Sequence, residues 1–119
     1  MIGQLHVALG YLSLGLALVV AVDAALGAWR AQLRSAMSER LDAVFLIATG
    51  VAAAGGLGIF VGGGRPAEGL HFVYAVLAFG AIPVAMSFTR GRPARQAAGA
   101  RLIGALVAVI LIWRLFQTG

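Results

Sequence analysis

Histidine is the residue type with the most specific chemistry in this chain, because it occurs only twice, as His6 and His71. An imidazole can ligate a metal or a haem iron, and it can exchange a proton near neutral pH. Cysteine is absent, which excludes disulfides, thiolate metal sites and thiol catalysis. The two histidines are far apart in the chain, so only the fold can bring them together.

The elements that must position them are long apolar stretches. Of 119 residues, 61% are hydrophobic and 11% are charged, which is more apolar surface than a soluble domain of this size can bury. A membrane-spanning helix needs about 20 predominantly apolar residues. The sequence therefore predicts a single all-α domain over residues 1–119, a four-helix transmembrane bundle in up-down-up-down order. Its helices are expected at about 2–29, 39–62, 67–88 and 97–116.

Polar residues mark the expected helix ends. Ser38 is predicted to cap the second helix, with Glu39 and Asp42 in its first turns. Pro66 is predicted to take the first position of the third helix. Asp23, near the end of the first helix, is expected to pair with Arg30 or with another arginine on the same side.

The arginines predict the orientation of the bundle. All nine basic residues are arginines, and seven of them lie in or beside the first and third connections. Only Arg65 and Arg114 lie on the opposite side. The positive-inside rule therefore predicts that both termini lie outside the cytoplasm, in a bacterial cytoplasmic (inner) membrane. Because the arginines flank apolar segments, they indicate contact with lipid headgroups of the bilayer and no nucleic-acid binding.

This topology places the two histidines at one depth. Each lies in the first turns of an odd-numbered helix, and these two helices run in the same direction on a diagonal of the bundle. Neighbouring axes about 8–10 Å apart give a diagonal of about 11–14 Å, a gap in which a planar macrocycle could stand between two imidazoles. A zinc ion would need further ligands, and none is evident in the sequence.

Small residues and two arginines accompany the histidines. Gly10 continues the His6 face of the first helix without bulk, which favours room for a flat ligand. Arg65 and Arg114 are expected at the same membrane face, where a guanidinium can pair with a haem propionate. The structural interpretation is that small residues pack helices, arginines reach headgroups and the histidines meet interfacial water.

The His-x-x-x-Gly spacing from His6 to Gly10, with a second histidine on the third helix, resembles small four-helix membrane cytochromes of b type in the cytochrome b561-like group. That resemblance implies haem b held between histidines of different helices. Many members hold two haems on four histidines, whereas this chain can hold at most one in this way. The Leu-His-Phe-Val-Tyr run after the Gly-Arg-Pro turn also resembles small uncharacterised four-helix bacterial membrane proteins, which imply no activity.

These observations lead to one interpretation and two alternatives. The leading interpretation is a b-type haem protein with axial ligands His6 and His71, which transfers electrons or holds haem near the outer leaflet. Quinone or a redox partner protein would exchange the electrons, and the chain would be a carrier or structural subunit rather than a catalyst. One alternative is a non-catalytic subunit or assembly factor, in a larger complex or a homo-oligomer. The other is a small ion or proton carrier that titrates the two histidines.

Overall fold

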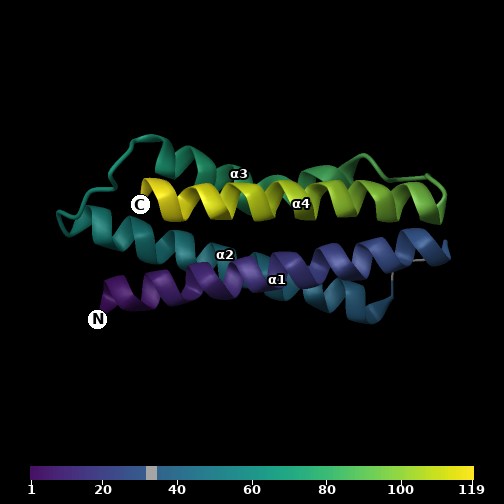
Figure 1. Ribbon diagram of the computed structural model, residues 1–119, viewed down its shortest axis with the longest axis horizontal. Helices are drawn as coiled ribbons and strands as arrows, with labels where there is room; N and C mark the ends of the chain where they lie inside the picture. Colours follow the sequence, from purple (N-terminus) through teal and green to yellow (C-terminus); the bar gives the residue numbers. More distant parts are fainter. Residues whose placement is uncertain (32–34) are drawn as a thin grey trace.

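The computed structural model describes residues 1–31 and 35–119, which form four α-helices. They are α1 (Ile2–Arg30), α2 (Ala36–Val61), α3 (Leu70–Ser87) and α4 (Ala94–Thr118). Successive helices run in opposite directions, so both ends of the chain and the connection over residues 62–69 lie at one end of the bundle (Figure 1). We call this the histidine end. The opposite end, where α1 and α3 finish and α2 and α4 begin, is called the arginine-rich end.

The helices are arranged in a closed order around the bundle axis. α1 packs against α2 and α4, and α3 packs against α4 and, less extensively, against α2. In the described part of the chain, α1 and α3 share no backbone contact. These two helices therefore lie on a diagonal, as the sequence predicted.

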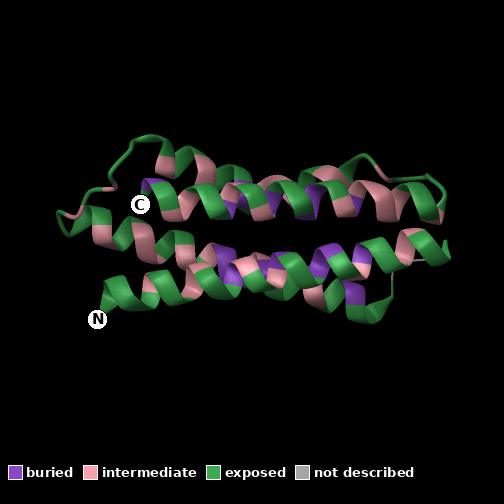
Figure 2. Cartoon of the chain, in the orientation of Figure 1, coloured by how far each residue is buried: buried purple, intermediate pink, exposed green. Residues whose placement is uncertain are grey.

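The buried core depends on small side chains. Ala17 of α1 and Ala105 and Ala108 of α4 are fully buried in one cluster, and buried residues lie on the inward faces of the helices (Figure 2). At Gly104, α4 comes so close to α3 that a Cβ would stand 2.9 Å from the carbonyl oxygen of Ala81. Close approach of this kind is a main source of helix association in lipid, where apolar burial alone gives little.

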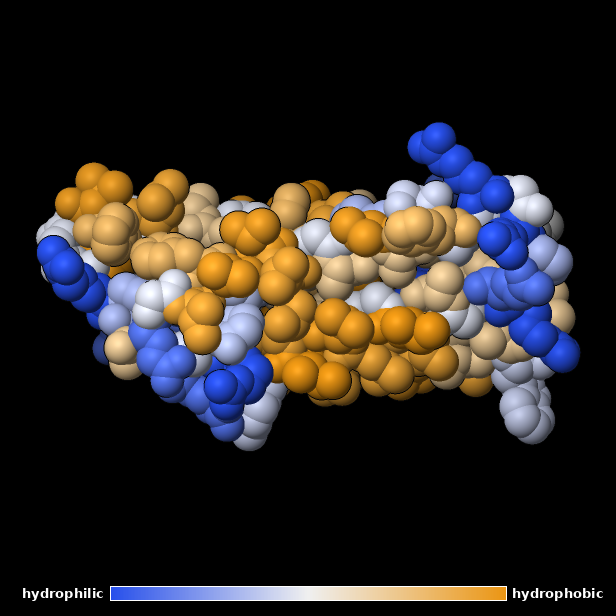
Figure 3. All heavy atoms as spheres, turned by 90° about the horizontal axis from the view of Figure 1, so that it is seen from above, coloured by the Kyte–Doolittle hydropathy of each residue, from blue (hydrophilic) through white to orange (hydrophobic). Residues whose placement is uncertain are grey.

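The surface outside this core is apolar as well. Val76 is 71% exposed and Ile103 is 64% exposed, although both are large aliphatic residues. On the face shown in Figure 3, hydrophobic side chains cover the middle of the molecule and hydrophilic ones gather at its two ends. All four helices are long and apolar enough to cross a membrane. The predicted all-α, four-helix bundle is thus confirmed, and its surface suits a multi-pass membrane protein.

Three helix starts differ from the predicted ones. α2 begins at Ala36 because Ser35, not Ser38, is its cap, and the Ser35 hydroxyl accepts a hydrogen bond from the Ser38 N–H at 3.1 Å. α3 begins only at Leu70, after a turn that follows Pro66, so this proline does not open the helix. The fourth helix is longer than predicted at both ends.

Candidate functional site

His6 of α1 and His71 of α3 meet inside the bundle at the histidine end. Their ring centroids are 6.3 Å apart, and the ring planes are inclined by 55°. Both residues are partly buried. Because α1 and α3 are diagonal, the two imidazoles reach toward each other across the bundle axis. Whether they face inward was open from the sequence, and the structure places the two rings beside each other inside the bundle, inclined by 55°.

The ring of His6 is held by the backbone of α2. Its Nδ1 lies 2.9 Å from the carbonyl oxygen of Ala52. A carbonyl oxygen can only accept, so Nδ1 carries the proton in this bond and Nε2 keeps its lone pair. The ring rests on Gly56, where a Cβ would stand 2.9 Å from the imidazole Cε1. Glycine is required at that position for the ring to lie where it does.

The ring of His71 is likewise held through its Nδ1, in this case by a side chain of α4. Its Nδ1 lies 3.3 Å from the hydroxyl oxygen of Thr118. That hydroxyl donates its own proton to the carbonyl oxygen of Arg114 at 3.0 Å, so toward His71 it acts as the acceptor. This arrangement is consistent with a proton on Nδ1 of His71, which would leave Nε2 with a free lone pair. An anchored Nδ1 and an available Nε2 are typical of histidines that ligate metals.

Two cavities meet at the imidazole pair, and both are lined by His6, His71 and Gly119. The deeper one, of about 160 Å³, continues toward the core past Ser13 and Ala78. The outer one, of about 130 Å³, opens toward the 62–69 connection. Its other lining residues are Gly56, Ile59, Phe60, Gly64, Arg65, Pro66 and Phe72. The histidines thus stand between a mostly apolar cavity on the core side and a cavity lined by one cation, Arg65, on the outer side.

The other expected site residues are only partly gathered here. Gly10 lines the deeper cavity, but the lack of a side chain there makes room for Phe116. A Cβ at position 10 would stand 3.2 Å from two carbons of the Phe116 ring. Arg65 lines the outer cavity beside both histidines. Arg114 lines neither cavity, since its guanidinium lies 5.9 Å from the centre of the Tyr74 ring and donates to the Gln117 side chain. The structure therefore brings one of the two arginines to the pair.

The residues present fit an axial pair for a macrocycle-bound metal. Two imidazole nitrogens bound to one metal ion at about 2.0–2.1 Å stand about 4 Å apart, with ring centres about 6 Å apart. The observed 6.3 Å agrees with that spacing. Among the described residues, no group of three His, Cys, Asp or Glu could hold a metal, so the remaining ligands would have to come from the macrocycle.

Room for such a ring is incomplete. Each cavity is close to the roughly 150 Å³ that holds a single benzene ring. A porphyrin is several times larger than either cavity, so lining side chains other than the two imidazoles would have to move to admit it.

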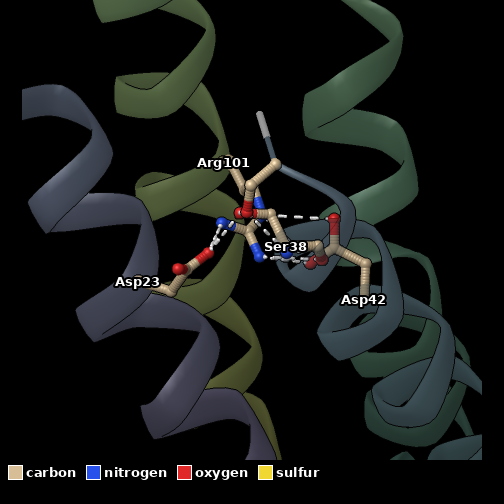
Figure 4. Close-up of polar contacts among 5 residues, drawn as sticks. Asp23, Ser38, Asp42 and Arg101 are labelled. Carbon is tan, nitrogen blue, oxygen red and sulfur yellow. Dashed lines mark hydrogen bonds and ion pairs between the residues drawn. The ribbon is translucent and has the colours of Figure 1, made fainter. Parts of the chain in front are cut away.

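A second polar cluster lies toward the arginine-rich end and joins three helices. Arg101 of α4 donates from Nη2 to Asp42 of α2 at 2.7 Å and from Nη1 to Asp23 of α1 at 2.6 Å. Its Nε also donates to both oxygens of Asp42, at 2.9 and 3.1 Å. The Ser38 hydroxyl donates to Asp23 at 2.7 Å (Figure 4). We call these four residues the Arg101 cluster.

The Arg101 cluster changes two sequence expectations and agrees with a third. Arg101 is only 4% exposed, so it is a buried partner and not a headgroup contact. Asp42 is also buried and pairs with it, whereas a role at the helix start was expected. Asp23 pairs with Arg101, which is one of the same-side arginines that the sequence had left open as its partner. A buried guanidinium between two carboxylates fixes α1, α2 and α4 at one register.

Comparison of the chain with protein-family models, with curated proteins and with solved structures gives no match.

Proposed function

We propose that this protein is a membrane b-type haem protein of the cytochrome b561-like kind, with His6 and His71 as axial ligands of one haem. One observation carries the proposal: two imidazoles from diagonal helices converge at 6.3 Å, and each has its Nδ1 anchored. Their expected tautomers direct both free lone pairs to ligation. The pair is the whole histidine content of the chain.

The protein's own groups would orient and shield the ligands. The Ala52 carbonyl and the Thr118 hydroxyl fix the rotation of the two rings. Arg65, at the outer cavity, is the cation available to a haem propionate. The apolar lining of the deeper cavity keeps water from the inner side of the site.

A bound bis-His haem supplies a one-electron couple with no open coordination position, which favours electron transfer over oxygen chemistry. The arginine distribution supports a bacterial cytoplasmic membrane with the histidine end and both termini outside the cytoplasm. At that depth, a membrane quinone or an external redox protein would be the electron partner.

Proton carriage by the same histidines has less support. Between the imidazole pair and the Arg101 cluster, the core is filled by apolar side chains such as Ala17, Val20 and Ile112. The hydroxyls of Ser13 and Thr49 bond to carbonyls of their own helices. The described residues thus provide no polar path along the bundle axis.

The visible spectrum tests the proposal. Protein purified in mild detergent after expression with ample haem is expected to show a sharp b-type α-band in the reduced-minus-oxidised spectrum. His6→Ala and His71→Ala should each abolish that band, because a single imidazole leaves one axial position unfilled. Gln4→Ala, an exposed change in the same turn of α1, should leave it intact. Colourless wild-type protein would overturn the proposal in favour of a non-catalytic subunit.

Thr118→Val is expected to weaken haem binding about tenfold, because loss of an anchoring partner typically lowers metal affinity 10–100-fold. The substitution keeps the shape of the side chain and removes the acceptor for His71 Nδ1. Haem titration of the apoprotein, followed by absorbance, measures the change. An unaltered affinity would show that the Thr118 hydroxyl does not position the ligand.

A further inference from the structure

A third cavity, of about 230 Å³, opens at the arginine-rich end between α1, the start of α4 and the connection before it. Its polar lining consists of Asp23, Arg30, Ser35, Ser38, Arg92 and Arg101. The remaining wall is apolar and mostly small, with Ala24, Leu26, Gly27, Met86, Ala94, Ala97 and Ala98. The cavity therefore has a charged rim and an apolar wall, at the level where the apolar belt of the bundle ends.

The charge that this cavity offers to a ligand is positive. The Asp23 carboxylate is engaged by Arg101 and by the Ser38 hydroxyl through the same oxygen, at 2.6 and 2.7 Å. Arg30 and Arg92 are exposed, and neither forms an ion pair with another residue in the part of the chain that the structure describes. Two guanidinium groups are thus left to face the cavity.

The position of the cavity limits what an anionic ligand can be. Basic pockets between transmembrane helices at this depth suit the headgroups of anionic lipids. A guanidinium matches phosphate oxygens bidentately, which a hydrated ammonium does not. The apolar wall beside the rim, which includes Gly27 and Ala98, suits the apolar part of a lipid that follows its headgroup.

We propose that this cavity binds the phosphate diester of one anionic phospholipid, held by Arg30 and Arg92. The site is independent of the haem proposal, because it lies at the other end of the bundle. Its ligand would join the end of α1 to the connection before α4, close to the point where Arg101 already joins α1 to α4.

Lipid retention in vesicles of defined composition tests this site. Wild-type protein is reconstituted in phosphatidylcholine alone or with phosphatidylglycerol. Phosphatidylglycerol that stays bound after extraction is then measured by native mass spectrometry. The midpoint temperature of thermal unfolding is measured separately in the same vesicles. The Arg30→Gln/Arg92→Gln variant should retain at least tenfold less phosphatidylglycerol than wild type and should lose the midpoint rise that this lipid produces. The matched control is Arg90→Gln/Arg95→Gln, which removes the same charge at the same end but outside the cavity.

The control double variant should behave as wild type. Equal losses in both double variants would show diffuse attraction to the membrane surface and would overturn the site. A wild-type protein that retains no phosphatidylglycerol would overturn it as well. If free glycerol phosphate raises the midpoint in phosphatidylcholine vesicles as much as phosphatidylglycerol does, the ligand is a soluble phosphate and not a lipid.

Crosslinking of the wild-type chain with a photoreactive phosphatidylglycerol tests the same site without any substitution. This experiment remains valid if the charge variants fold poorly. Crosslinks should fall on peptides containing Gly27–Arg30 or Arg92–Ala98. Crosslinks confined to the lipid-facing sides of α2 and α3 would contradict the proposal.

Discussion

Replacing Arg101 by methionine is expected to lower the free energy of unfolding by about 3–5 kcal/mol, the usual cost of removing one partner from a buried ion pair. The guanidinium makes hydrogen bonds to Asp42, Asp23 and the Ser38 carbonyl, and it is 4% exposed. Methionine fills much of the same volume, but it leaves two carboxylates close together without the cation between them. Equilibrium unfolding in mixed micelles measures the difference.

Arg95→Met is the matched control for this change. Arg95 lies on the same helix and is exposed, so the same substitution there should shift the unfolding free energy by no more than about 0.5 kcal/mol. Adding Asp23→Asn and Asp42→Asn to Arg101→Met should recover part of the loss, because the triple variant buries no carboxylate. If Arg101→Met and Arg95→Met were equally stable, the cluster would contribute nothing to the fold.

Gly104→Val is expected to destabilise the bundle by about 1–3 kcal/mol or more, the range for overpacking a close-packed core. A Cβ at this position would stand 2.8 Å from the Ala85 Cβ, 2.9 Å from the Ala81 carbonyl oxygen and 3.3 Å from the Ile82 Cα. Backbone atoms cannot rotate away as a long side chain can. The substitution therefore has to separate α3 from α4, and the same unfolding titration reports the cost.

Gly99→Ala supplies the control for Gly104. Nothing lies within 4 Å of a Cβ built at Gly99, which is on the same helix. Alanine should be neutral there or stabilising by up to about 1 kcal/mol, because it favours the helical backbone over glycine. Equal effects at positions 99 and 104 would show that helix propensity, and not contact with α3, determines the outcome.

The fold was accessible from the sequence because lipid imposes simple requirements on length and hydrophobicity. Four apolar stretches predicted four helices and, with short connections, the diagonal placement of α1 and α3. Equal depth of His6 and His71 followed from that order. Their orientation did not, because the apolar faces of these helices look alike whether they meet lipid or protein. Only the packing of His6 on Gly56 and of His71 on Gly119 shows which way the rings turn.

The Arg101 cluster was not predicted from the sequence, for a different reason. Arginines near helix ends generally reach headgroups, so Arg101 was counted with the loop residues. The available signal was position: α4 begins at Ala94, which puts Arg101 two turns inside the helix, and Asp23 lies two turns before the end of α1. A cation and a carboxylate at matching depth on two apolar helices indicate a pair. The sequence predicted the start of α4 three residues too late. Arg101 was therefore placed nearer the helix end than it lies, and its equal depth with Asp23 was not recognised.

The place of Arg101 on the last helix has a consequence for how the protein is made. Asp23 and Asp42 leave the ribosome on α1 and α2, while the guanidinium that joins them is still untranslated. α4 also provides the contact surface that both α1 and α3 require. During that interval the nascent chain shows carboxylates on helices that belong in lipid, where such groups are costly. Synthesis of α4 supplies the guanidinium that pairs with both carboxylates, so the cluster is completed only after the other three helices have been made.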